Sequence, residues 1–193
     1  MSATPGQAPR VLLLPGWQDS GPDHWQSRWE RLHGYERVQQ ADWTWPRRGD
    51  WMARLEEVLL EDDRPNLLVA HSLGCHLVAA WAAHSRHTGR VQGALLVAPP
   101  DTEREDAPPQ LHGWAPMERA PLPFPSVALL SRDDPFGHFY RMAAVAEVWG
   151  ARLVDAGHRG HLNAESGLGD WPEGRAFLRT LGAGDPPSPA VSP

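Results

Sequence analysis

The sequence predicts an α/β protein whose core is a mostly parallel sheet of six strands with helices on both faces. Short apolar runs alternate along the 193 residues with segments whose apolar residues recur at helical spacing. Parallel neighbours need a crossover connection, usually a helix, so this alternation favours a parallel sheet. No internal repeat and no shift in composition interrupts the pattern, which indicates a single domain.

That unit is expected to span residues 10–181, a length sufficient to bury a hydrophobic core. Residues 1–9 are mostly small or polar, and residues 182–193 are rich in proline and glycine. Such composition cannot bury enough apolar surface to order a chain. We therefore expect one domain flanked by two flexible tails.

In the N-terminal part, an apolar run at residues 10–14 predicts the first strand, which a Pro-Gly pair ends. A helix is expected next, with Asp23 as its cap and with Trp25 and Trp29 on one face. Residues 38–41 predict a second strand, although their apolar character is weaker.

The middle of the chain continues the alternation. An amphipathic helical spacing begins at Trp51. Residues 67–70 predict the third strand, which is followed by a helix to about residue 83. Residues 91–98 predict the fourth strand. Residues 101–125 are rich in proline and charge without periodicity, and long loops of this kind are often functional.

The C-terminal part supplies the last two strands. Residues 127–130 and 152–154 predict them, with a helix over 139–149 between the two. A proline at position 172 then begins a final helix.

A serine stands where the third strand is expected to turn into a helix. Ser72 is flanked two positions on either side by Ala70 and Gly74. Small residues suit this place because a larger side chain would collide with neighbouring backbone at an abrupt turn. The pattern matches the G-x-S-x-G turn that exposes a nucleophilic serine, with alanine for the first glycine. The alternative is a serine that only caps the helix.

An acid and a histidine follow later strands in the chain order Ser…Asp…His, which is the order of an α/β-hydrolase triad. Asp133 and Asp134 come after the fifth strand, and His158 and His161 after the sixth. The carboxyl ends of parallel strands meet at one edge of a sheet. Asp134 and His161 are 161 − 134 = 27 residues apart, enough for one helix and one strand. Both are therefore expected at the edge that carries Ser72.

These side chains are suited to nucleophilic catalysis. The imidazole of His161 can take the proton of the Ser72 hydroxyl, and Asp134 can hold that imidazole in the productive tautomer. A tetrahedral oxyanion needs two donors. The backbone N–H groups of Leu73 and Trp17 are the expected pair, because they follow the third and the first strand.

Several residues have a simpler interpretation beside the catalytic one. Asp133 competes with Asp134 for the acid position, and the one not used is expected in a turn. His158 and His161 have a spacing found in metal sites, but no HExxH or CxxC pattern accompanies them, so we expect no metal. His71 is expected to pack or to hydrogen-bond locally, and Cys75 to pack as a small apolar side chain.

Five segments spread over residues 10–181 carry a resemblance to a known family. They are Leu14-Pro15-Gly16-Trp17, Ser20-Gly21-Pro22-Asp23-His24-Trp25, Ala70-His71-Ser72-Leu73-Gly74, Ser131-Arg132-Asp133-Asp134-Pro135 and Gly160-His161-Leu162-Asn163-Ala164-Glu165-Ser166-Gly167. On these segments the chain resembles the small, single-domain α/β-hydrolase family typified by the retinoblastoma-binding serine hydrolase and its bacterial relatives.

The resemblance implies a compact α/β-hydrolase fold without a large lid domain. It also implies that Ser72, Asp134 and His161 occupy the triad positions, and it places the acid at Asp134 rather than Asp133. The chain departs from the wider superfamily in two places. A Pro-Gly pair stands where lipases carry His-Gly, and Ala70 replaces the first glycine of the serine turn.

The function expected from these observations is that of a serine hydrolase. It would cleave a small carboxylic ester, thioester or amide through an acyl-enzyme on Ser72, with a small-molecule acyl substrate and no cofactor. The alternative is a protein-binding module that keeps the hydrolase fold with little turnover. No sequence motif supports a protein partner, because the Leu-x-Cys-x-Glu segment associated with partner binding in the family is not present.

Composition excludes other classes of function. The formal net charge is −6, lysine is absent and the arginines form no basic cluster, which argues against nucleic-acid binding. No apolar run approaches the length of a membrane span. The N-terminus resembles no secretory signal, and the single Cys75 suits a reducing compartment, so we expect a cytoplasmic location.

Overall fold

A central sheet and its flanking helices make up the part of the chain that the structure describes. The computed structural model describes residues 8–182. Its strands are β1 (Arg10–Leu14), β2 (Glu36–Arg37), β3 (Asn66–His71), β4 (Val91–Val97), β5 (Ser126–Leu130) and β6 (Arg152–Asp155). Its helices are α1 (Trp25–His33), α2 (Arg48–Leu60), α3 (Leu73–His84), α4 (Phe139–Val148) and α5 (Pro172–Arg179). Short 3₁₀ helices lie in the connections as η1 (Thr88–Arg90), η2 (Pro109–Trp114) and η3 (Ala164–Ser166).

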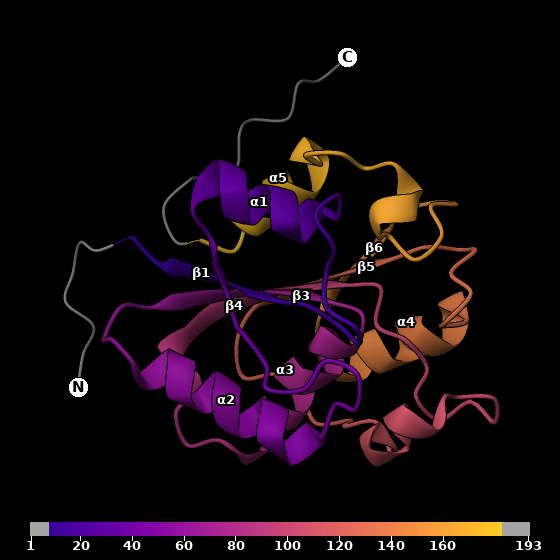
Figure 1. Cartoon of the computed structure of the whole chain (residues 1–193), viewed down its shortest axis with the longest axis horizontal. Coiled ribbons are helices and arrows are strands. Elements are labelled where there is room, and N and C mark those ends of the chain that lie inside the picture. The colour runs from indigo at the N-terminus through magenta and orange to yellow at the C-terminus, as the bar shows by residue number, and fades with distance from the viewer. Residues whose placement is uncertain (1–7, 183–193) are drawn as a thin grey trace.

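The strands form one sheet in the order β2-β1-β3-β4-β5-β6. Every neighbouring pair is parallel. Figure 1 shows α1 and α5 above the sheet and α2, α3 and α4 below it. The predicted six-stranded sheet with helices on both faces is therefore confirmed.

β3 is the centre of the sheet, and all of its residues are buried. It is almost continuously apolar because helices cover both of its faces. The register pairs Leu14 with Ala70 and His71 with Val97, so β1, β3 and β4 end at the same edge. This is the edge at which the polar residues singled out in the sequence are expected.

Tryptophan side chains fill the cores on both sides of the sheet. Above it, the ring of Trp25 packs against those of Trp29 and Trp171, with centroids 4.7 and 5.0 Å apart. Below it, Trp51 and Trp114 pack edge to face with centroids 5.5 Å apart. Such pairs add to the free energy gained by burying their large apolar area. These tryptophans therefore serve mainly to pack the core.

The structure corrects two local predictions. The second strand lies at Glu36–Arg37 and not at residues 38–41, although Val38 still donates from its N–H to the carbonyl of Leu13. The cap of α1 is His24 rather than Asp23, because Nδ1 of His24 accepts the hydrogen bond from the Gln26 N–H. An imidazole nitrogen takes the place of the expected carboxylate at this helix start.

The long segment between β4 and β5 is anchored rather than loose. Glu103 forms ion pairs of 2.7 Å with both Arg119 and Arg141, and hydrogen bonding from Arg119 lowers the pKa of Glu103 to about 2. Trp114 at the end of η2 is buried and donates from Nε1 to the carbonyl of Pro46. The segment therefore forms a fixed wall beside the edge where the strands end.

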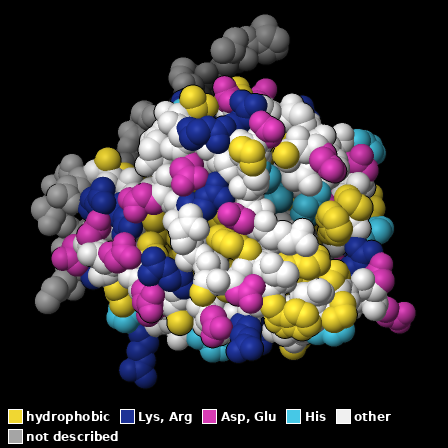
Figure 2. All heavy atoms as spheres, viewed as in Figure 1, with side chains coloured by type: hydrophobic (Ala, Val, Ile, Leu, Met, Phe, Trp, Pro, Cys, Tyr) yellow, Lys and Arg dark blue, Asp and Glu magenta, His cyan; other side chains and the backbone are white. Residues whose placement is uncertain are grey.

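None of the helices within residues 8–182 is long and apolar enough to cross a membrane. The tails expected at residues 1–9 and 182–193 fall almost wholly outside the described residues. Figure 2 shows acidic and basic side chains interspersed over one face of the molecule.

Candidate active site

Ser72 lies at the turn between β3 and α3 in a strained backbone conformation. Its φ and ψ are 55° and −125°, a region that residues with a side chain rarely adopt. Two glycines allow the turn to pack so closely. A methyl group on Gly74 would overlap the carbonyl oxygen of Leu14, and one on Gly16 would lie 2.8 Å from Cβ of Ser72. The requirement for a small residue at position 74 is therefore steric.

The side chain of Ser72 forms a hydrogen-bonded chain with His161 and Asp134. The Ser72 hydroxyl lies 2.8 Å from Nε2 of His161. Nδ1 of the same ring lies 2.9 Å from each carboxylate oxygen of Asp134. The side chains of His161 and Asp134 are only 9% and 4% exposed, so water competes little for these hydrogen bonds. The structure thus brings together three side chains from the ends of β3, β5 and β6.

Asp133 has a different place from its neighbour. It accepts hydrogen bonds from the Ser131 hydroxyl at 2.8 Å and from the Gly160 N–H at 2.9 Å. These contacts tie the loop after β5 to the loop that carries His161. The carboxylate that faces the imidazole is Asp134, and Asp133 shapes the loop beside it.

The two backbone groups expected to bind an oxyanion belong to residues that line one cavity together with Ser72. Leu73 is the first residue of α3, so its N–H has no acceptor within the helix. Gly16 packs against this turn, because a Cβ atom added to Gly16 would lie only 3.1 Å from the Leu73 nitrogen. Trp17 follows directly, and its indole N–H is held at 2.8 Å by the carbonyl of Thr44. The loop after β1 is therefore fixed beside the helix start.

His71 makes a contact that sequence reasoning did not anticipate. Its Nε2 lies 2.9 Å from the carbonyl oxygen of His161, 90 residues away in the chain. Burial holds the pKa of His71 well below its ordinary value, so the ring is neutral and donates this hydrogen bond from Nε2. The residue before the serine therefore supports the backbone of the histidine loop.

His24 and Gln26 also lie at this edge, and no periodicity in the sequence pointed to them. The amide of Gln26 donates to the carbonyls of Leu14 and Val69, which joins the ends of β1 and β3. The ring of His24 packs against that of His71 with centroids 4.6 Å apart. His24 stands in one of the segments that carry the family resemblance, whereas nothing in the sequence singled out Gln26.

The remaining candidates stand apart from this chemistry. Cys75 is fully buried, and burial raises the pKa of its thiol, so it packs as a small apolar side chain. His158 lines a separate hollow with Asp134 and His138. Within residues 8–182, no group of three or more metal-ligating side chains is assembled.

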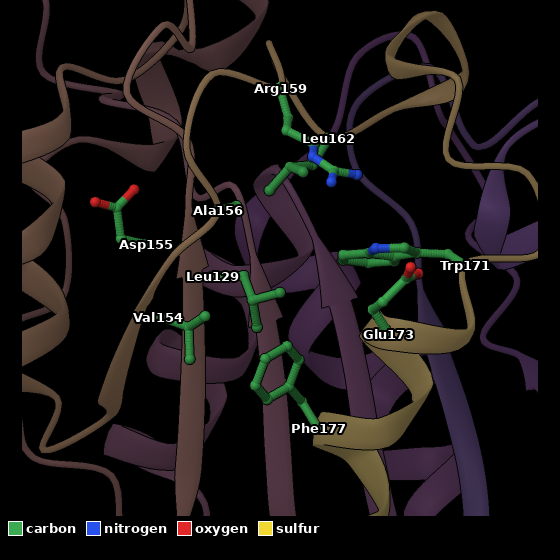
Figure 3. Close-up of a pocket in the computed structure, with 9 residues that line it drawn as sticks. All are labelled: Leu129, Val154, Asp155, Ala156, Arg159, Leu162, Trp171, Glu173 and Phe177. Carbon is green, nitrogen blue, oxygen red and sulfur yellow. The ribbon is translucent and has the colours of Figure 1, made fainter. Parts of the chain in front are cut away.

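A cavity of about 480 Å³ opens above Ser72 and lies in the size range of small-molecule sites. His161, Leu73 and Trp17 line it. A smaller hollow of about 220 Å³ lies on the other side of the histidine loop, between β5, β6 and α5. Figure 3 shows Leu162, Phe177 and Trp171 around this second hollow. It contains none of the three hydrogen-bonded side chains, so the cavity at Ser72 is the candidate active site.

Comparison with known proteins bears directly on this geometry. The sequence profile of a family described as serine hydrolase matches residues 11–180. The chain belongs to the serine hydrolase family. The match spans every strand from β1 to β6 and the loops that carry Ser72, Asp134 and His161. No curated protein sequence is significantly similar to this hydrolase.

Solved structures agree with the assignment. A YdeN-like hydrolase from Pectobacterium atrosepticum is 30% identical, with a TM-score of 0.78 over 91% of this chain and 93% of that chain. The ydeN gene product of Bacillus subtilis is 21% identical, with a TM-score of 0.69 over 90% and 98%. A carboxylesterase from Bacillus cereus is 16% identical, with a TM-score of 0.59 over 90% and 87%. This serine hydrolase therefore has the α/β-hydrolase fold, and residues 8–182 contain no large lid domain.

Proposed function

We propose that this serine hydrolase cleaves a small carboxylic ester, thioester or amide through an acyl-enzyme on Ser72. The observation that carries the proposal is the continuous chain of hydrogen bonds from Ser72 through His161 to Asp134. A serine hydroxyl is a weak nucleophile until a neighbouring base takes its proton. The strained turn presents that hydroxyl at the floor of a cavity large enough for a small substrate.

In the acylation step, Oγ of Ser72 attacks the substrate carbonyl carbon while Nε2 of His161 takes the hydroxyl proton. Asp134 accepts from Nδ1 and stabilises the imidazolium that forms. The N–H groups of Leu73 and Trp17 bind the oxyanion of the tetrahedral intermediate. When the bond to the leaving group breaks, His161 returns the proton to the departing oxygen, sulfur or nitrogen.

In the deacylation step, a water molecule attacks the acyl-enzyme. His161 now takes a proton from this water, and the new oxyanion uses the same two N–H groups. Collapse of the intermediate breaks the bond to Ser72, which recovers its proton from His161. The products are a carboxylic acid and the free leaving group, so the reaction balances without a cofactor.

Structural neighbours support a hydrolytic reaction of this class. The carboxylesterase of Bacillus cereus and an esterase of Thermogutta terrifontis share the fold. Because both are less than 25% identical, their substrates do not transfer to this chain. The proposal rests on the side chains at Ser72 and names only the bond class.

Labelling with a fluorophosphonate tests the proposal, because this reagent phosphonylates a serine only when a base activates it. We expect rapid labelling of the wild type and none of Ser72→Ala. Ser85→Ala is the matched control, because Ser85 lies at the far end of α3 and hydrogen-bonds to Glu56. Circular dichroism should show that both variants are folded.

The same experiment separates the two functions considered for this fold. A protein-binding module with little turnover predicts that folded wild-type protein resists the reagent. Equal labelling of the wild type and Ser72→Ala would place the nucleophile elsewhere. Either result would contradict the acyl-enzyme proposal.

A further inference from the structure

The cavity at Ser72 has two halves of different chemistry, which come from opposite sides of the sheet. The apolar half is lined by Trp17, Pro100, Pro108 and Leu111. The polar half is lined by Gln18, Asp19, Asn163 and Glu165. In Figure 1, α1 and the turn after β6 lie above the sheet, whereas the segment between β4 and β5 lies below it. Hydrophobic side chains gather toward the lower right of Figure 2, whereas charged side chains are spread over its upper, left and lower middle parts.

The position of His161 indicates which half of the cavity takes the leaving group and which takes the acyl chain. The leaving group must lie against Nε2 of His161, because it receives its proton there. Asn163 and Glu165 come two and four residues after this histidine and line the cavity, as does Phe136, whose ring packs against that of His161 with centroids 4.7 Å apart. The polar half is therefore on the leaving-group side. The acyl chain then extends from the carbonyl carbon toward Pro108 and Leu111.

The polar half carries a surplus of negative charge. Glu165 is exposed and forms no ion pair with any residue of the described chain. Asp19 is paired with Arg37 at 2.5 Å, but the same guanidinium also pairs with Glu30 at 2.7 Å, so one positive charge is shared by two carboxylates. No arginine lines the cavity.

The histidines of the cavity do not offset this charge. Burial lowers the pKa of His24 to about 3 and holds that of His71 well below its ordinary value, so both rings are neutral near pH 7. A cationic group entering the cavity thus meets two carboxylates and no arginine among the lining residues, because the guanidinium of Arg37, whose charge reaches His24, is held by Asp19 and Glu30. Field lines focused by a cleft of one sign also raise the local concentration of an oppositely charged substrate.

A second feature of the polar half indicates a ligand there. His24 is only 5% exposed and lines the cavity. Its Nδ1 accepts from the Gln26 N–H, so the proton of the neutral ring is on Nε2. Within the described residues Nε2 has no hydrogen-bond partner. A buried donor without a partner is costly, and an acceptor on a bound molecule would remove that cost.

From these contacts we infer that the substrate is an ester or amide with an apolar acyl chain and a leaving group that carries a positive charge. The inference rests on the proposed function, because it assigns the two sides of the bond that Ser72 attacks. The ammonium of the leaving group lies near Glu165 and Asp19, and the acyl chain near Leu111.

Two esters of one acid test the charge. Butyrylcholine and 3,3-dimethylbutyl butyrate have nearly the same shape and differ in the charge of the alcohol. We expect kcat/KM to be about five-fold or more higher for the choline ester in low salt. The ratio should fall as the ionic strength rises, because Glu165 is exposed. A ratio of one or below would overturn the inference.

Two variants assign the preference to named residues. Glu165→Gln should lower the ratio about two- to five-fold, which is the effect of losing one exposed charge pair. Asp19→Asn should lower it further, and asparagine tolerates the left-handed backbone of position 19 (φ 63°). The control is Glu147→Gln, an exposed carboxylate on α4 that does not line the cavity. An unchanged ratio in Glu165→Gln and Asp19→Asn would contradict the assignment.

A second matched pair tests which side carries the charge. The ethyl esters of 4-(trimethylammonio)butanoate and 5,5-dimethylhexanoate place the same charge difference on the acyl chain. We expect the charged acyl ester to be the poorer substrate, because its ammonium would lie against Leu111 and Pro108. A preference for it would reverse the two halves and overturn the inference.

Failure of the inference is distinguishable from failure of the proposed function. If the reaction itself is wrong, neither ester pair is hydrolysed and no fluorophosphonate label appears on Ser72. If only the inference is wrong, the neutral esters are cleaved by the wild type, Ser72→Ala is inactive and the charged choline ester has no advantage.

Discussion

At the scale of single residues, neighbouring side chains of one type have separate tasks. Asp134 faces Nδ1 of His161 with both oxygens, whereas Asp133 accepts from Ser131 and Gly160. Similarly, His161 faces the serine while His71 donates to the carbonyl of His161. Chemical type alone does not separate these pairs, because the role of each depends on the atoms that surround it.

The two aspartates give a matched prediction. Asp134→Asn should lower kcat by about 10³- to 10⁴-fold, because an amide no longer stabilises the imidazolium or enforces the same tautomer. Asp133→Asn should lower it by less than about ten-fold, since the Oδ1 of asparagine still accepts from Ser131 and Gly160. Steady-state hydrolysis of a p-nitrophenyl ester measures both. Equal losses would contradict the separate places of the two carboxylates.

His71 is predicted to act through the position of His161. His71→Phe keeps an aromatic ring but removes the donor to the His161 carbonyl, so we expect kcat to fall about ten- to hundred-fold with little change in KM. His71→Gln retains an N–H and should recover part of this loss. If His71 only fills space, the phenylalanine variant should be the more active of the two.

At the scale of elements, the close approach of β1 to the start of α3 fixes the turn at Ser72. Gly16 and Gly74 have no side chains, so the loop after β1 lies directly against the serine turn. The register of β1 and β3 pairs Leu14 with Ala70, so the loop after β1 and the serine turn after β3 begin at the same level of the sheet edge. The amide of Gln26 adds a link by bonding the ends of both strands.

Gly74→Ala tests this packing. The added methyl group would overlap the Leu14 carbonyl oxygen, so we expect a loss of about 3 kcal/mol in the free energy of unfolding, measured in urea. Gly49→Ala is the control, because Gly49 lies in α2 and a methyl group there meets no atom within 4 Å. It should leave stability unchanged or raise it by up to about 1 kcal/mol.

At the scale of the whole molecule, the fold keeps several imidazoles neutral. Burial lowers the pKa of His24 to about 3 and that of His76 to about 4, and holds that of His71 well below its ordinary value. Below the ordinary imidazole pKa of about 6.5, the unfolded chain therefore binds more protons than the native state. The free energy of unfolding must fall as the pH falls through this range.

We expect each of these histidines to cost about 2 kcal/mol of stability on going from pH 7 to pH 5. Denaturant unfolding at the two pH values measures the sum. His76→Gln should reduce the pH dependence, because its amide can still donate to the Pro100 carbonyl that His76 contacts at 2.6 Å. The control is His84→Gln, which replaces an exposed imidazole and should leave the pH dependence of the free energy of unfolding as in the wild type. If the free energy of unfolding of His76→Gln depends on pH as steeply as that of the wild type, the buried neutral His76 is not a cause of the pH dependence.

Much of this architecture was predictable from local patterns. Alternating apolar runs and helical spacings are short-range features, so they located the strands, the helices and the serine turn. The misplaced second strand shows the limit of this reasoning. Glu36 and Arg37 join the sheet through β1, and neither residue has the apolar character that marks a strand.

The sequence by itself determined the order of the chemistry: a serine after one strand, then an acid and a histidine after later ones. It could do so because parallel strands end at a common edge. Only the tertiary structure decided which atoms meet there. The contact of His71 with the His161 carbonyl, the buried His24 and the two halves of the cavity all join residues from distant parts of the chain. Such contacts depend on packing in three dimensions, which leaves no periodic signal in the sequence.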